Sequence, residues 1–256
     1  MLILLTPSKT MDFTSKVPIS IPAQAPLFLS DAELIAKSIK KLTVKEITTL
    51  MKASPAIAGN VKKMYTNWSP KGQKPALWTY MGDVYKGMYA NKLDKNAAWW
   101  AEDHIVIMSG LYGLVRPFDT ISPYRLEMKA ALTVSGKIGL YDFWGTKLAR
   151  YVEAQANGIV YNLCSDEYGK GVVKNLSSNI RIITPVFYDK RPSGVGRAPI
   201  YNKMMRGVMA RWMIDHRTET PEQLQAFTMH GYAYDTARST PDAPAFYRKT
   251  MKPLVF

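Results

Sequence analysis

The stretch "HIVIM" (104–108), continued by "SGLYGLVRPFDTISPYRLEM" (109–128), decides the fold expected for this chain. The first five residues form an apolar run without alternation, as is typical of a strand buried on both faces. The chain then enters a turn bracketed by Gly110 and Gly113, where glycine permits a sharp bend and a close approach to a ligand. Polar and aromatic residues follow at once. This order predicts a buried sheet with a binding site at its edge.

Two further apolar runs have the same organisation. "LILL" (2–5) precedes "TPSKT" (6–10), and "GIVYNL" (158–163) precedes "SDEYGKG" (165–171). In an open α/β sheet, ligands bind in the crevice beyond the carboxyl ends of parallel strands. If the three strands are parallel neighbours, the polar residues after them share one crevice. We expect it to contain Lys9, Ser109, Tyr112, Arg116, Tyr124, Arg125, Glu127, Asn162, Ser165, Glu167, Tyr168, Lys170 and Arg206.

The chemistry of these residues suits a nucleotide or a nucleobase. Tyr112 could stack on a planar ring. Arg116 and Arg125 could hold phosphate or carboxylate oxygens in two-point contacts, and Glu127 could accept a proton or orient an amine. The alternative is an interior polar network in which the same groups satisfy one another.

The remaining patterns predict helices between the strands. Ser30 with Glu33, and Thr43 with Glu46, have the spacing of capping boxes. Residues 140–155 and 205–217 have helical spacing of apolar residues. The fold class expected is therefore mixed α/β, with residues 1–256 forming a single compact domain around a central sheet.

The charge of the chain favours anionic partners. The 256 residues include 34 Lys and Arg against 20 Asp and Glu, a formal charge of +14. Residues 61–100 carry seven lysines and two aspartates, whereas residues 101–180 are balanced. Such an excess suits nucleic acid, phosphorylated ligands or an acidic membrane surface. No stretch is apolar for long enough to span a membrane, and the single cysteine, Cys164, indicates a reducing compartment, so we expect a cytoplasmic protein.

Residues 44–66 resemble two helices joined by a hairpin. "SPAIAG" (54–59) would break the helical pattern, and "NVKKMY" (60–65) would begin the second helix. Backbone N–H groups at a helix start favour a phosphate. The residues predicted to bind DNA here are Lys52, Gly59, Asn60, Lys62 and Lys63. The alternative is a helical hairpin whose lysines are merely solvated.

Six motifs resemble the YaaA family of bacterial peroxide-stress proteins. They are "LTPSKTMD" (5–12), "GDVYKGM" (82–88), the stretch 109–128 quoted above, "YDFWG" (141–145), "NLCSDEYGK" (162–170) and "MRGVMARWM" (205–213). The resemblance implies a cytoplasmic protein that limits oxidative DNA damage, a mixed α/β fold with a helix-hairpin-helix element, and DNA binding in a basic cleft. It implies no established reaction. Cys164 stands where such sequences usually have alanine, which argues against an obligatory thiol.

Two classes of function remain open. The first is a protective protein that binds duplex or locally opened DNA with little sequence preference. The second is an enzyme acting on a nucleotide, nucleobase or nucleic acid in the strand-end crevice. The three histidines are scattered, and neither a Walker loop nor a GxGxxG motif follows a strand, so we expect no metal site and no cofactor.

Overall fold

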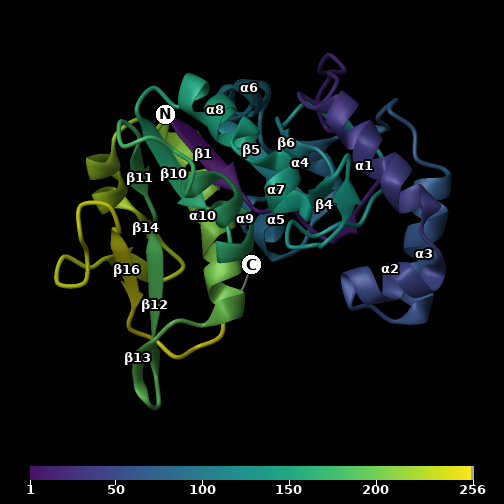
Figure 1. Cartoon of the computed structure of the whole chain (residues 1–256). Helices are drawn as coiled ribbons and strands as arrows, with labels where there is room; N and C mark the ends of the chain where they lie inside the picture. Colours follow the sequence, from purple (N-terminus) through teal and green to yellow (C-terminus); the bar gives the residue numbers. More distant parts are fainter. Residues whose placement is uncertain (255–256) are drawn as a thin grey trace.

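The computed structural model describes residues 1–254 and has a mixed α/β fold (Figure 1). Its first five-stranded sheet has the order β11-β10-β1-β5-β6. The strands are β1 (Leu2–Leu5), β5 (Ile105–Ser109), β6 (Gly113–Val115), β10 (Ile159–Leu163) and β11 (Arg181–Ile183). β1 lies between β10 and β5 and is parallel to both. The prediction that the three apolar runs form neighbouring parallel strands is confirmed.

The register brings the polar turns to one edge of this sheet. Leu5 pairs with Leu163 on one side and with Ile107 on the other, so the three strands end at similar heights. The turn after β5 returns the chain as β6, which is antiparallel to β5. This return is possible because Gly113 adopts a φ of 70°, in the region that favours glycine.

A second five-stranded sheet has the order β13-β12-β16-β15-β14. Its strands are β12 (Val186–Arg191), β13 (Gly194–Gly196), β14 (Thr228–Met229), β15 (Tyr232–Tyr234) and β16 (Ala245–Arg248). The short pairs β2 (Thr10–Met11) with β4 (Tyr80–Met81), β3 (Lys74–Pro75) with β7 (Thr120–Ile121), and β8 (Thr133–Val134) with β9 (Lys137–Ile138) complete the strands. Buried side chains from both large sheets, from Leu2 to Phe246, belong to one hydrophobic cluster.

The helices surround these sheets. They are α1 (Leu29–Lys41), α2 (Val44–Met51), α3 (Pro55–Thr66), α4 (Ala76–Thr79), α5 (Asp83–Met88), η1 (Ala90–Lys92), α6 (Lys95–His104), α7 (Leu140–Trp144), α8 (Lys147–Gln155), α9 (Asp166–Val173), α10 (Pro199–His216) and η2 (Pro221–Ala226). In Figure 1 the α2–α3 pair and the β12–β13 hairpin lie at opposite lower corners, with α9 and α10 between them. Among the described residues, no helix has the length and apolar content needed to cross a bilayer.

Some helix boundaries differ from those predicted. The Thr43–Glu46 capping box is present in both directions, with distances of 2.7 and 3.3 Å. Ser30, however, lies inside α1, which begins at Leu29 without a side-chain cap. The helix expected over 140–155 is divided into α7 and α8, because Gly145 adopts a φ of 49° between them.

The α2–α3 pair begins its second helix earlier than the sequence suggested. The connection consists of residues 52–54, and Ser54 accepts the N–H of Ile57 as the N-cap of α3. Pro55 occupies the first turn of α3, where its missing N–H costs nothing. Gly59 and Asn60 therefore lie inside the helix. The prediction that residues 54–59 break the helix is wrong.

Candidate functional site

A cavity of about 720 Å³ lies at the carboxyl ends of β1 and β10. We call it the strand-end cavity. Its walls come from five segments: the turn after β1, the start of α5, residues 124–127, the start of α9, and α10. Its charged wall residues are Lys9, Asp83, Arg125, Glu127, Asp166, Glu167, Lys203 and Arg206. Four are cationic and four are acidic, so the cavity is mixed in charge.

Eight of the residues predicted for the crevice line this cavity. They are Lys9, Tyr124, Arg125, Glu127, Ser165, Glu167, Tyr168 and Arg206. These residues come from four separate parts of the chain. They meet because the strands before Lys9 and Ser165 are paired directly.

Ser109 and Tyr112 belong to a buried network beneath the cavity, so the prediction that they line it is wrong. Ser109 is fully buried and donates its hydroxyl to the Tyr124 hydroxyl at 2.8 Å. Tyr112 is 1% exposed, and its hydroxyl accepts hydrogen bonds from Trp68 Nε1 and the Ser122 amide. A ring so enclosed is not available to stack on a base. The alternative of an interior polar network therefore describes these two residues.

Arg116 also lies outside the strand-end cavity. Its guanidinium contacts the Asp119 carboxylate at 2.7 Å and lies 3.9 Å from that of Glu102. The backbone amide of Arg116 donates to Asp119 as well, at 2.8 Å. With two acidic neighbours already, Arg116 is held in a structural cluster, and the two-point contact predicted for it with a ligand is wrong.

Asn162 and Lys170 lie near the strand ends but do not line the strand-end cavity. Asn162 Oδ1 accepts the Cys164 amide at 3.1 Å and fixes the turn after β10. Lys170 is exposed on α9, with its ammonium 6.0 Å from the centre of the Tyr141 ring. The prediction that Asn162 and Lys170 line the crevice is therefore wrong.

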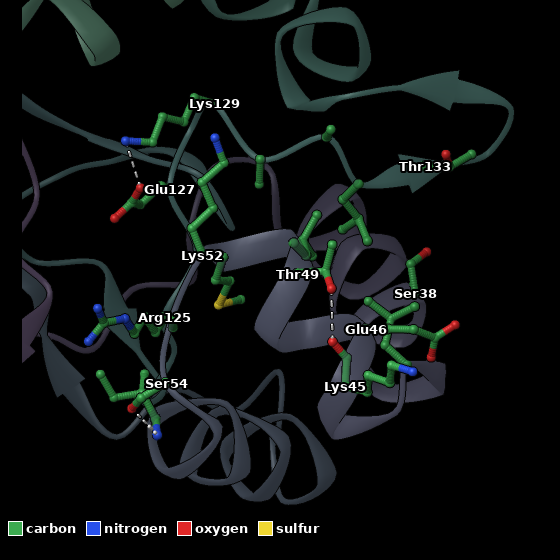
Figure 2. A pocket seen from close by; sticks show the side chains of 18 of the residues that line it. Ser38, Lys45, Glu46, Thr49, Lys52, Ser54, Arg125, Glu127, Lys129 and Thr133 are labelled. Atoms are coloured by element: carbon green, nitrogen blue, oxygen red, sulfur yellow. Dashed lines mark hydrogen bonds and ion pairs between the residues drawn. The ribbon is translucent and has the colours of Figure 1, made fainter.

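A second cavity, of about 1100 Å³, lies between the α2–α3 pair and residues 125–133 (Figure 2). We call it the basic cavity. Its charged wall residues are Lys9, Lys45, Glu46, Lys52, Arg125, Glu127 and Lys129. Five are cationic and two are acidic. Lys9, Arg125 and Glu127 belong to the walls of both cavities, so the two spaces adjoin at these residues.

Where the two cavities meet, the glutamate carboxylates are paired with lysines. Glu127 pairs with Lys9, and also with Lys129 at 3.0 Å. Lys129 reaches Glu167 at 3.3 Å. Burial alone would raise the pKa of Glu127, but Lys9 and Lys129 outweigh it and hold that pKa below its usual value. Glu127 is therefore ionised at neutral pH.

Three cationic side chains of the basic cavity have no such partner. Within residues 1–254, no carboxylate lies within ion-pairing distance of Lys45, Lys52 or Arg125. The other carboxylate of the wall, Glu46, accepts both the amide and the hydroxyl of Thr43. Figure 2 shows Lys52 extending from the end of α2 toward the wall that holds Lys129. These free charges could meet phosphate groups.

The residues predicted to bind DNA in the α2–α3 pair have different environments. Lys52 lines the basic cavity, whereas Lys63 is exposed on α3. Lys62 donates to the carbonyl oxygens of Lys40 and Leu42, at 2.7 and 2.8 Å, and so stabilises the end of α1. Because Gly59 and Asn60 lie beyond the first four residues of α3, their N–H groups are used within the helix and do not face outward. The phosphate contact predicted from a helix start at Asn60 is therefore wrong.

Sequence reasoning missed Lys45, Lys129 and Lys203. Lys129 follows directly on the stretch that was singled out, and its pairing with two glutamates could have been suspected from "EMK" (127–129). Lys45 and Lys203 offered no local signal, because only the tertiary fold brings α2 and α10 to the two cavities. Among the described residues, no group of three or more His, Cys, Asp or Glu side chains is arranged to hold a metal ion.

Comparison with known proteins defines the family. The chain is an α/β protein in which charged side chains lie in two adjoining cavities near the ends of parallel strands. Residues 1–238 match the family described as "Peroxide stress protein YaaA", and the chain belongs to that family.

Relatives extend over almost the whole chain. A UPF0246 protein of Paracidovorax citrulli is 37% identical over 257 residues, covering 97% of this chain and 99% of its own. One from Rhizorhabdus wittichii is 39% identical over 254 residues, covering 98% and 100%. One from Bordetella pertussis is 39% identical over 258 residues, covering 97% and 99%.

Proposed function

We propose that this peroxide-stress family protein acts in the cytoplasm by binding DNA along the basic cavity, and so limits oxidative damage to it. The observation that carries the proposal is the set of unpaired cationic side chains, Lys45, Lys52 and Arg125, on the wall of one large cavity. Side chains of this kind neutralise phosphates and release counterions, which supplies sequence-tolerant affinity. The formal charge of +14 adds long-range attraction.

The α2–α3 pair supports this proposal by its lysine side chains. The backbone N–H groups at the start of α3 are not part of the argument. α2 contributes Lys45, and Lys52 follows its last residue, so both lysines reach the cavity from one element. Lys63, exposed on α3, adds a third charge on the same pair. A helix-hairpin-helix type of contact would then position the DNA without reading its bases.

The test is the salt dependence of DNA binding. Fluorescence anisotropy with a labelled duplex, at several salt concentrations, should show affinity falling steeply as salt rises, with little difference between sequences. The double variant Lys45→Gln/Lys52→Gln should reduce the slope of log K against log salt by about 2, because each phosphate contact contributes about 0.9.

The matched control changes two exposed lysines outside both cavities, Lys95→Gln and Lys174→Gln. It removes the same net charge, so it should leave the slope nearly unchanged. Absence of binding at low salt, or equal losses in the two double variants, would contradict the proposal.

The second candidate, an enzyme acting on a nucleotide, has weaker support. Tyr112 and Ser109 are buried, and the charge of Glu127 is already neutralised by two ammonium groups. The strand-end cavity does have the size of a small-molecule site, which usually measures about 300–1,000 Å³.

A further inference from the structure

The strand-end cavity contains an arginine that the fold places without a carboxylate partner. Arg206 is partly buried on α10, and within residues 1–254 its guanidinium makes neither a hydrogen bond nor an ion pair. Burial lowers its pKa, and the longer-range attraction of Asp166 does not compensate. A charge held in this way is costly unless something pairs with it.

The position of Arg206 depends on tight helix packing. The next residue, Gly207, lies against α5 so closely that a Cβ atom would come 1.7 Å from the Val84 carbonyl oxygen. Asp83 and Val84, at the start of α5, line the same cavity as Arg206. The contact between the two helices therefore fixes the backbone of Arg206 beside the cavity, and its side chain lines the wall.

Three other donors that line this cavity have side chains without a partner among the described residues: Arg125, Ser165 and the exposed Lys203. Arg125 has no side-chain partner among the described residues. Ser165 is the N-cap residue of α9, but its side chain makes no capping hydrogen bond. Its amide is held instead by Thr6 Oγ1, at 2.7 Å. Two guanidinium groups and a hydroxyl are a donor set suited to phosphate oxygens.

The acidic wall residues restrict what else the ligand carries. Glu127 and Glu167 are neutralised by lysines, whereas Asp83 and Asp166 have no ion-pair partner among the described residues. A second phosphate beside these aspartates would be repelled. Hydroxyl or amino groups would instead donate hydrogen bonds to them. A single phosphate joined to a hydroxyl-bearing sugar meets both conditions.

We propose that the strand-end cavity binds one nucleotide by its phosphate, held by the guanidinium groups of Arg125 and Arg206. The nucleotide is either free or part of a DNA strand that enters from the basic cavity, since Arg125 lines both spaces. Phosphate binding at Arg206 does not require that the basic cavity binds DNA.

The test is calorimetric titration of the whole protein with AMP, adenosine and inorganic phosphate. AMP should bind at least tenfold more tightly than adenosine. Arg206→Gln should weaken AMP binding by on the order of tenfold to a hundredfold, the usual effect of losing a charged hydrogen bond. The control Arg211→Gln removes the same charge from α10, but Arg211 is already paired with Asp215 at 2.8 Å, so AMP binding should be unchanged.

Thermal unfolding separates binding from folding. Because Arg206 is a partly buried, unpaired charge, Arg206→Gln should keep or raise the melting temperature, and AMP should raise the melting temperature only when Arg206 is present. Equal binding of AMP and adenosine, or equal losses in Arg206→Gln and Arg211→Gln, would overturn the proposal. So would a fall in the melting temperature of Arg206→Gln without AMP.

A competition experiment identifies the source of the phosphate. If a short single-stranded oligonucleotide displaces AMP from the wild type, the site accepts a nucleotide within a strand. If AMP stays bound while the oligonucleotide binds elsewhere, the ligand is a free nucleotide. Duplex binding is measured separately by anisotropy. If the wild type fails to bind AMP but still binds duplex DNA, the inference about Arg206 is refuted and the proposed function is not.

Discussion

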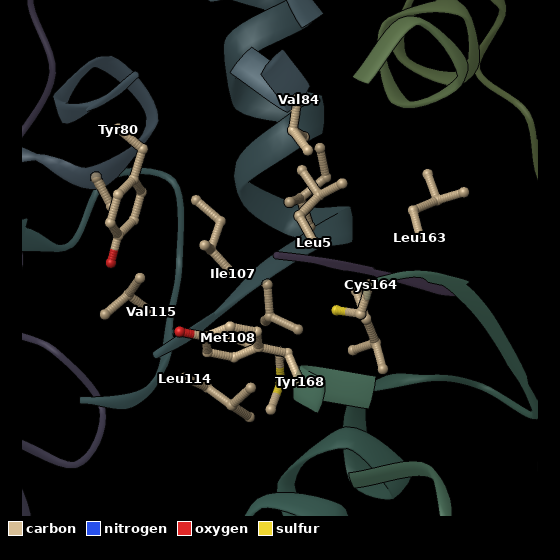
Figure 3. Close-up of a cluster of buried hydrophobic side chains, with 14 of the residues drawn as sticks. Leu5, Tyr80, Val84, Ile107, Met108, Leu114, Val115, Leu163, Cys164 and Tyr168 are labelled. Atoms are coloured by element: carbon tan, nitrogen blue, oxygen red, sulfur yellow. The ribbon is translucent and has the colours of Figure 1, made fainter. Parts of the chain in front are cut away.

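Cys164 illustrates how burial decides the chemistry of a single residue. Its side chain is 2% exposed and lies among apolar side chains, including Leu163 and Tyr168 (Figure 3). Burial raises the pKa of the thiol to about 12, although the nearby charge of Arg206 acts in the opposite direction. Peroxide attacks the thiolate, which is therefore scarce at neutral pH. We therefore expect a peroxide-stress role for this protein not to require its cysteine.

We predict that the native protein resists thiol modification. Incubation with hydrogen peroxide or iodoacetamide, followed by mass spectrometry, should leave Cys164 unmodified, whereas the urea-unfolded protein should react fully. Cys164→Ala should cost about 1 kcal/mol of stability and preserve peroxide survival in cells. Rapid oxidation of Cys164 in the folded protein would contradict this.

Glu102 predicts a measurable pH dependence of stability. It is buried, and burial raises its pKa to about 7, with the charge of Asp119 adding to the rise against opposing contacts from Phe118 and Arg116. A carboxyl whose folded pKa is raised binds more protons in the folded state. Its stabilisation is therefore complete below about pH 4.5 and is lost as pH rises through about 7.

Compared with the wild type, Glu102→Gln should be less sensitive to pH over this range. The difference in the free energy of unfolding should change by about 3 kcal/mol between pH 4.5 and pH 8, at 1.36 kcal/mol per pKa unit. The glutamine oxygen can still accept the Phe118 amide, so the fold is kept. Urea unfolding at several pH values measures the difference, and parallel curves for the two proteins would refute the raised pKa.

Among the helices, two glycines provide a matched pair. Gly207 lies where α10 meets α5, with no room for a methyl group, whereas at Gly59 in α3 no atom lies within 4 Å of an added Cβ. Gly207→Ala should lower the free energy of unfolding by about 3 kcal/mol through overpacking. Gly59→Ala should raise it by about 0.5–1 kcal/mol through helix propensity.

Urea unfolding gives both values, and anisotropy adds a readout for DNA. Because the Gly59 amide is used inside α3, Gly59→Ala should leave duplex affinity unchanged. A large loss of affinity in the stabilised Gly59→Ala protein would mean that DNA approaches the α3 backbone at that point.

Local patterns predicted the strands of the central sheet better than the contents of its site. Apolar runs followed by polar turns identified three parallel strands, since burial on both faces leaves a mark in the sequence itself. Tyr112 was misplaced because its burial depends on Trp68, 44 residues away. The start of α3 was misjudged because Pro55 was interpreted as a helix breaker, although proline suits a first turn.

Across the whole molecule, Glu127 marks the place where the basic cavity meets the strand-end cavity of mixed charge. It lies on the wall of both cavities and holds Lys9 and Lys129, whose side chains are 57% and 60% exposed. Exposed pairs of this type contribute little to stability, typically up to about 1 kcal/mol. The carboxylate does, however, reduce the positive potential where the cavities adjoin.

We therefore predict that Glu127→Gln raises duplex affinity at low salt while changing the free energy of unfolding by less than about 1 kcal/mol. Two ammonium groups lose their partner and become available to phosphates. Anisotropy and urea unfolding test the two statements. Destabilisation by several kcal/mol would instead assign Glu127 a structural role, and a fall in affinity would mean that it contacts the DNA directly.

Lys52, at the C-terminal end of α2, places a positive charge at a backbone position that disfavours side chains. It adopts left-handed angles, with φ and ψ both 46°, and ends the helix where glycine is the usual residue. A side chain in that conformation costs roughly 1–2 kcal/mol, which a glycine would have avoided. At this position the chain therefore combines a helix end that is less stable than glycine would give with a positive charge on the wall of the basic cavity.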